Sequence, residues 1–381
     1  MRKRSTITHP VAGILPEELM MEIIVRIPVR FLGRLRCVCK SWNALITDPQ
    51  FALELIDHNK NTQQKILFPC FSPHARNSAK PYDRNFKECI VAGSINGIVC
   101  LASLCRPGTR FVALWNPSIK YWKPIHLPDT GDCNWFESIG LAFDSLANDY
   151  KVIRLLPLLR QMTSSSSSIS RVEVYSASQD SWSVVHSEIP FFTTQLKCSL
   201  IVKGVPYWSR NYHSSYCVYD NFQSNVIASF DPRTGLYKKI SYPQILLNEK
   251  TSVHPFNLMD SLAILMYSPG EKPNQTFHVY ALDDENSCAT TWINLCSTPA
   301  PTVQLNKDLR ILRCFEDPAG KTIVVGWNPH QSDFFLYDLK TDCLIESIGL
   351  DAYRTRWDES YHHVESLVYI PGMEPIPTED G

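Results

Sequence analysis

The stretch "FVALWNPSIKYWKPI" (residues 111–125) has the pattern of a β-hairpin. Apolar and aromatic residues run up to Trp115, a polar turn containing Asn-Pro follows, and a second run begins at Tyr121 and Trp122. Val, Ile, Phe, Tyr and Trp favour strands, whereas Asn, Pro and Ser favour turns. The stretch therefore predicts two antiparallel strands joined by a short turn.

Four further stretches repeat this plan along the chain, at intervals of about 50 to 60 residues. In each, a strand that ends in a large aromatic leads through a polar turn into a second strand. The five leading aromatics are Trp115, Tyr175, Phe230, Tyr280 and Tyr337. The second large residue follows seven positions later in three units and is displaced or replaced in the other two: Trp122, Trp182, Tyr237, Trp292 and Leu344.

A strand-like stretch precedes each hairpin, for example "GSINGIVCLA" (residues 93–102) and "GKTIVVGWN" (residues 320–328). A sheet of three or four strands that recurs in this way is typical of a β-propeller, because radial packing lets neighbouring sheets cover one another. We expect an all-β, propeller-like domain of about five to six blades. The final "HHVESLVYIP" (residues 362–371) is expected to close the ring beside residues 88–92. A β-sandwich or a looser β-solenoid is the alternative.

The first sixty residues have a helical pattern instead. Residues 15–28 carry apolar side chains at helical spacing, and Pro28 ends that helix. A second short segment contains Gly33, which costs on the order of 1 kcal/mol relative to alanine within a helix. Asp48 is the predicted N-cap of the last helix. Between them, a third helix is predicted with one apolar face formed by Leu35, Val38, Cys39, Trp42, Leu45 and Ile46.

Four short helices of this size cannot bury all their apolar surface among themselves. The excess of Leu, Ile, Val and Trp predicts that a partner completes the surface. The alternative is a helical cap packed on the rest of the chain. The predicted fold class is therefore α+β and multi-domain, with a small all-α module before the β-domain.

Composition narrows the class of protein. The chain has 381 residues and a formal net charge of −1, which gives no electrostatic case for nucleic acid or a membrane surface as partner. The basic start of the chain leads into no apolar signal region, and the apolar runs are too short to span a bilayer. We expect a soluble protein of the cytoplasm, the nucleus or both.

The thirteen cysteines predict no metal site. No Cys-x-x-Cys pair occurs, whereas structural zinc sites use ligands two to four residues apart. On the predicted third helix, Cys37 and Cys39 would point to different faces and could not share a metal ion. Reduced thiols that pack as small apolar groups are the expectation.

Motifs for catalysis are also missing from the sequence. There is no Gly-x-Ser-x-Gly elbow, P-loop, His-Glu-x-x-His or dinucleotide fingerprint. We expect a protein that is not an enzyme and that takes no cofactor. A propeller-type enzyme whose scattered loop residues converge is the alternative.

The stretch "ILPEELMMEIIVRIPVRFLGRLRCVCKSWNALITDPQFALEL" (residues 14–55) resembles an F-box, particularly the plant form. The remainder looks like the F-box-associated, kelch-related domain, whose pieces include "NGIVCL" (residues 96–101), "LWNPSIKYWKPI" (residues 114–125) and "VESLVYI" (residues 364–370). The resemblance implies a substrate-recognition subunit of a Skp–cullin–F-box (SCF) ubiquitin ligase. The F-box would bind the Skp-type adaptor and, through it, cullin and RING subunits. The β-domain would hold an unidentified target protein for ubiquitination and proteasomal degradation. A scaffold that works outside the ligase is an alternative.

The resemblance also implies an organisation and a set of site residues. Residues 1–11 would be a disordered N-terminus, 12–57 the F-box, 66–371 the propeller-like domain and 372–381 a flexible tail. Contact with the adaptor, or support of that surface, is expected from Leu15, Pro16, Ile24, Val29, Leu32, Leu35, Val38, Cys39 and Trp42. Target binding is expected from the loops at 128–135, 156–170, 209–221 and 268–275, the third of which holds Tyr212, Tyr216 and Tyr219. Alternate tyrosines of that loop could instead belong to a blade core.

Overall fold

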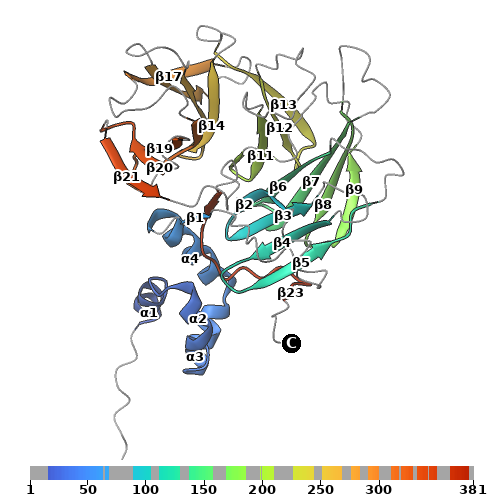
Figure 1. Ribbon diagram of the computed structural model, residues 1–381. Helices are drawn as coiled ribbons and strands as arrows, with labels where there is room; N and C mark the ends of the chain where they lie inside the picture. The colour runs from blue at the N-terminus through green and yellow to red at the C-terminus, as the bar shows by residue number, and fades with distance from the viewer. Residues whose placement is uncertain are drawn as a thin grey trace, which may run out of the picture.

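A computed structural model of the chain shows a small helical module followed by a larger β-domain (Figure 1). The structure describes residues 16–62, 65–67, 89–103, 111–128, 137–157, 169–185, 198, 200–209, 226–243, 251–267, 276–283, 291–299, 310–316, 319–328, 333–341, 343–349 and 361–376. Within these ranges no helix is both long enough and apolar enough to cross a membrane.

The helical module consists of four helices: α1 (Glu17–Ile24), α2 (Val29–Leu35), α3 (Lys40–Thr47) and α4 (Pro49–Thr62). The capping prediction at the last helix is confirmed, since the carboxylate of Asp48 accepts a hydrogen bond from the backbone N–H of Gln50 at 2.8 Å. The first helix was expected to end at Pro28, but α1 already ends at Ile24, and Pro28 instead takes the N-cap position of α2.

The prediction of one helix from Leu35 to Ile46 is wrong. Tight hydrogen bonds end α2, with the N–H of Val38 donating to the carbonyl of Leu35 at 3.1 Å. Cys39 then has extended backbone, with φ −157° and ψ 167°, and α3 begins only at Lys40. Cys37 and Cys39 consequently lie in the connection between two helices, where both are exposed, and not on opposite faces of one helix.

The β-domain contains five sheets, each built on four consecutive strands, within the described residues. The first comprises β2 (Ile90–Ile95), β3 (Ile98–Ser103), β4 (Phe111–Asn116), β5 (Tyr121–Ile125) and, at its edge, β23 (Glu374–Pro375). The second comprises β6 (Ser138–Asp144), β7 (Asp149–Pro157), β8 (Ile169–Ser176) and β9 (Ser181–Val185). The third comprises β10 (Leu200–Val202), β11 (Val205–Ser209), β12 (Val226–Asp231) and β13 (Leu236–Ser241).

The last two sheets have the same order. The fourth comprises β14 (Ser252–Leu258), β15 (Ser261–Tyr267), β16 (Thr276–Asp283) and β17 (Thr291–Pro299). The fifth comprises β18 (Arg310–Glu316), β19 (Thr322–Asn328), β20 (Asp333–Asp338) and β21 (Cys343–Gly349). Every neighbouring pair is antiparallel. The predicted all-β, propeller-like domain is confirmed.

The repeated hairpin forms the third and fourth strands of each sheet, and its two large residues set the register. Trp115 lies opposite Trp122, and the same pairing joins Tyr175 to Trp182, Phe230 to Tyr237 and Tyr337 to Leu344. In the fourth sheet the insertion changes the register, so that Trp292 lies opposite Leu282. Cross-strand pairs of large side chains stabilise a sheet, which accounts for the recurrence of the pattern.

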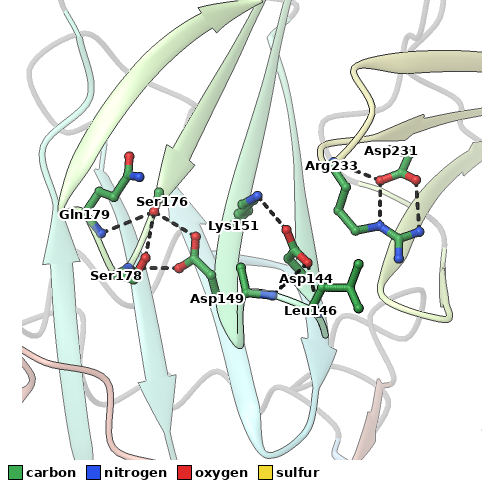
Figure 2. A network of polar contacts seen from close by, with 10 residues as sticks. Asp144, Leu146, Asp149, Lys151, Ser176, Ser178, Gln179, Asp231 and Arg233 are labelled. Carbon is green, nitrogen blue, oxygen red and sulfur yellow. Dashed lines mark hydrogen bonds and ion pairs between the residues drawn. The ribbon is translucent and has the colours of Figure 1, made fainter.

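The turn inside the hairpin is stabilised by a polar side chain at the end of the third strand. Asn116, Asp231 and Asp338 each accept a hydrogen bond at 2.9 Å from the backbone N–H two residues further on. This is the Asx-turn geometry that Asn and Asp favour. Figure 2 shows the corresponding region of the second and third sheets, where Arg233 binds Asp231 through its guanidinium and its backbone.

The core of the β-domain lies between the sheets. Four apolar clusters each join residues of two consecutive sheets, as Leu114 and Leu141 do for the first and second. A backbone hydrogen bond also joins the second sheet to the segment just before the third, since the N–H of Cys198 donates to the carbonyl of Ile139 in β6 at 2.9 Å. A sheet can bury apolar side chains on both of its faces, because a neighbouring sheet covers each face.

Each sheet therefore has two distinct ends. We call "turn end" the end at which the first strand leads into the second and the third into the fourth, as at residues 96–97 and 117–120 of the first sheet. We call "loop end" the opposite end, where the second strand leads to the third and one sheet leads to the next. Connections at the turn end are mostly two to four residues, and those at the loop end are mostly longer, the four residues between β19 and β20 excepted.

Strands near the C-terminal end of the described chain pair with strands near its N-terminal end. The strand β22 (Tyr361–His363) pairs with β1 (Lys65–Leu67), which directly follows the helical module, and it contacts β2. Residues 362–371 were expected as a strand beside residues 88–92. β22 includes only the first two of them, and it contacts β2 as expected but pairs with β1. Residues 372–376 were predicted as part of a flexible tail, but Met373 is buried and β23 pairs with β5. Residues 377–381 lie outside the described residues.

Candidate functional site

The helical module has its own small core. The buried apolar residues are Ile24, Val25, Val29, Leu32, Leu45, Ile46, Phe51 and Leu55, and Leu367 from the far end of the chain packs against them. In α1, Met20 and Ile24 share one face because they are four residues apart, and Ile27 follows in the turn after the helix. This face packs into the core.

A second set of apolar residues on the module faces outward. Leu19, Ile23, Phe31, Val38 and Leu53 are between 40% and 61% exposed. They are five of the thirteen large exposed hydrophobic residues in the described part of the chain, although the module is a small fraction of it. We call these five residues the outward apolar set. An excess of this kind is typical of a surface that another protein covers.

The structure sorts the nine predicted adaptor-contact residues into three groups. Ile24, Val29 and Leu32 are buried in the module core, and Leu35 and Trp42 are partly buried against it. These five side chains support the surface and give the module its shape. Exposed positions are held by Pro16, Val38 and Cys39, while Leu15 lies outside the described residues.

Sequence reasoning did not assign Leu19, Ile23, Phe31 and Leu53 to the site. The signal was present in α1, where Leu19 and Ile23 are four residues apart and lie beside the buried face. An apolar arc this wide cannot fit one small core. On α2, the guanidinium of Arg30 lies 4.8 Å from the centre of the Phe31 ring, so part of that ring faces a charged side chain.

The connection between α2 and α3 carries the exposed thiol of Cys39. The Sγ atom of Cys39 lies 3.1 Å from the hydroxyl oxygen of Ser41. Hydrogen bonds from the Ser41 side chain and from the backbone of Trp42 and Ser41 lower the pKa of the Cys39 thiol. No group of three or more His, Cys, Asp or Glu side chains that could hold a metal ion occurs in the described ranges.

The predicted target loops connect strands at the loop end of their sheets. The segments 129–135, 158–168, 210–221 and 268–275 lie outside the described residues, and so do Tyr212, Tyr216 and Tyr219. The strands that flank these segments are described, and their ends all belong to the loop end.

A buried charge network supports the loop end of the second sheet. The guanidinium of Arg154 lies 2.6 Å from a carboxylate oxygen of Glu137 and 2.9 Å from one of Glu173, and it donates to the carbonyl of Pro128 at 3.0 Å. All three charged residues are at most 1% exposed. Because removal of one partner would leave a buried charge unpaired, the network fixes the start of β6 against β7 and β8.

Comparison with known families matches both parts of the chain. Residues 14–53 match the F-box domain, and residues 75–370 match the F-box associated beta propeller domain. The first span contains α1 to α3 and the start of α4, and the second contains β2 to β22.

Curated relatives from Arabidopsis thaliana are similar over the same regions. An F-box protein is 22% identical over 96% of this chain and 98% of its own length. An F-box/WD-40 repeat-containing protein is 24% identical over 97% of this chain and 90% of its length. An F-box/kelch-repeat protein is 28% identical over 44% of this chain and 50% of its length. The chain belongs to the family of F-box proteins that carry an F-box associated β-propeller domain.

Proposed function

We propose that this protein is the substrate-recognition subunit of an SCF ubiquitin ligase in the cytoplasm or nucleus. The F-box would bind a Skp-type adaptor, and cullin and RING subunits would join through that adaptor. The β-domain would hold a target protein for ubiquitination. Its contribution would be effective concentration, because a held target meets the charged conjugating enzyme in a nearly intramolecular encounter.

The observation that carries the proposal is the outward apolar set on a module that belongs to the F-box family. A partner that covers such residues would gain binding free energy of roughly 25 cal/mol per Å² of apolar surface removed from water. The core residues Ile24, Val29 and Leu32 would act indirectly by holding α1 and α2 in place.

The proposal is supported by where the module and the strand ends beside the predicted target loops lie on the sheets. The module is joined to the turn end of the first sheet, where Asn116 and Gly97 contact the segment that also contacts α4. The strands that carry the predicted target loops end at the loop end. A target on the loop end would therefore leave the F-box free for the adaptor.

A binding assay with a plant Skp-type adaptor tests the proposal. The wild-type chain should bind, and the double variant Ile23→Asp/Phe31→Asp should bind at least about tenfold more weakly, because two exposed apolar contacts become charged. Both positions are 40% to 49% exposed, so the fold should survive. Leu146→Asp, at a residue 90% exposed on the β-domain, is the matched control and should bind like wild type.

Two outcomes of the binding assay would contradict the proposal. One is a wild-type chain that fails to bind the adaptor. The other is a double variant that binds as tightly as wild type while its circular dichroism is unchanged. Adaptor binding without co-purification of cullin would argue against a ligase subunit and for a scaffold.

A further inference from the structure

The last residues of the described chain contact the helical module directly. We call residues 364–376 the C-terminal strap. The side-chain amide of Asn59, a buried residue of α4, donates to the backbone carbonyl of Glu365 at 3.0 Å. Two residues further on, Leu367 packs against the apolar core of the module. The strap therefore supplies part of the core of a domain that lies near the other end of the sequence.

The same strap is held firmly on the turn end of the first sheet. The amide of Asn116 donates to the carbonyl oxygens of Ser366 and Val368 at 3.2 and 2.8 Å. Gly97 lets the strap pass closely, since a Cβ atom there would lie 1.9 Å from the hydroxyl oxygen of Ser366. In Figure 1 the dark red end of the chain runs between the helices and the first sheet to β23.

A buried lysine connects the strap to the second sheet as well. The ammonium group of Lys123 donates to the carbonyl of Pro371 at 2.8 Å and to that of Ala177 at 3.4 Å, and it lies 3.1 Å from a carboxylate oxygen of Asp180. Lys123 is 5% exposed. Three acceptors match the three N–H donors of an ammonium group. The strap is therefore anchored to two sheets, and not only to one edge.

Two antiparallel chain segments bridge the module and the β-domain. The direct connection runs from α4 into β1, and the returning segment runs from β22 into the strap, with Lys65 opposite His363 and Asn59 bonded to Glu365. A single covalent connection would let the module swing. Two paired segments with contacts on both sides restrict that motion, because each contact must break before the module can turn.

We propose that the C-terminal strap is a positioning element that fixes the direction of the F-box relative to the β-domain. The inference rests on the proposed function, because the fixed direction would determine which lysines face the conjugating enzyme. Loss of the strap contacts should leave adaptor binding intact and make the choice of lysines less selective. Asn59 and Leu367 are positioning residues in this sense.

Distance measurements on the full chain test the inference without any partner. Spin labels carried by noncanonical amino acids would replace Lys40 in α3 and Asp260 in the β14–β15 turn, which are both exposed. Wild type should give one narrow distance distribution. The double variant Asn59→Ala/Leu367→Ala should give a distribution at least twofold broader. Asn59→Ala alone, which removes one hydrogen bond, is the milder variant if the double variant loses the fold of the module.

Matched controls exist in the same chain. Asn61→Ala lies on α4 at an exposed position, and Leu146→Ala lies on the β-domain at a residue 90% exposed. Both controls should keep the narrow distribution. Equal widths for wild type and for the folded strap variants would overturn the inference.

Self-ubiquitination in a reconstituted SCF complex gives the second measurement. Mass spectrometry should find few modified lysines on the β-domain of wild type and a larger set on the strap variants, at unchanged adaptor affinity. An unchanged set of lysines would overturn the positioning role. A wild-type chain that does not bind the adaptor would instead contradict the proposed function, and the spin-label distances would still decide whether the strap fixes the module.

Discussion

The helical module and the β-domain use their apolar residues in opposite ways. Between consecutive sheets of the β-domain, four clusters bury apolar side chains from both neighbours. The module has one cluster, and its largest fully buried side chain is Phe51. Five of its apolar residues stay 40% to 61% exposed.

The difference shows what each part needs from other chain segments. A sheet finds its cover in the next sheet, because the repeat supplies the same face again. The module has no repeat, so it takes Leu367 from the strap on one side and leaves the outward apolar set on another. We therefore expect the module to be the less stable part and the part that gains most from a partner.

The largest expected effect is the loss of the module core while the sheets persist. Phe51→Ala removes a side chain that is 0% exposed and should cost about 3 to 5 kcal/mol. A module of four helices cannot absorb that loss, so amides of α1 to α3 should exchange rapidly in hydrogen–deuterium exchange. Leu53→Ala, at a position 49% exposed on the same helix, should change little. Equal loss of protection in the five sheets would break the comparison, because the two parts would then unfold together.

A substitution at the contact between the C-terminal strap and the first sheet should destabilise the chain nearly as much. Gly97 has φ +82°, and a Cβ atom there would clash with Ser366. Gly97→Ala should destabilise the chain by about 2 kcal/mol or more, from backbone strain and the clash together. Gly235→Ala is the matched control, since Gly235 also has positive φ but its nearest neighbour would be 3.8 Å away.

Urea denaturation measures both glycine variants. The difference between them isolates the contact with the strap, because the backbone strain is shared. If Gly97→Ala cost no more than Gly235→Ala, the strap would not be tightly held at this point.

Sequence patterns predicted the sheets better than the junction, for a physical reason. The hairpin repeats because Trp115 and Trp122, or Tyr175 and Trp182, must lie opposite each other, and such local pairs are visible in sequence spacing. The bond from Asn59 to Glu365 joins residues 306 positions apart, and no local pattern encodes it.

The helical site shows the same limit. Helical spacing placed Leu35 and Cys39 on one predicted face, because periodicity alone does not report a break in the backbone. The extended conformation of Cys39 separates α2 from α3 and turns Val38 outward, where it is 61% exposed. Sorting the predicted residues into core and surface required the packing of all four helices with Leu367.

A smaller effect of opposite sign is expected in α2. A Cβ atom added at Gly33 would meet no other atom within 4 Å, so Gly33→Ala should fit without a clash. Alanine is favoured over glycine by about 1 kcal/mol inside a helix. Hydrogen exchange of α2 should slow accordingly. A variant that is more stable but binds the adaptor more weakly would place this face of α2 in the interface, which sharpens the assignment of the outward surface.

The smallest effect concerns charge at the turn end of the β-domain. Partial burial raises the pKa of Asp231, but the side chain and backbone N–H of Arg233 outweigh burial and hold that pKa below its usual value. A carboxylate whose pKa is lowered in the folded state stabilises the fold at pH values above its unfolded-state pKa near 3.9. That contribution is lost as pH falls through the folded-state pKa. Because the Arg233 side chain is 35% exposed and solvent screens the pair, Asp231→Asn should cost only about 0.5 kcal/mol at pH 7. In urea denaturation the difference from wild type should shrink as pH falls through the lowered pKa of Asp231 and vanish below it, where both side chains are neutral. A constant difference at every pH would show that packing, not charge, holds this turn.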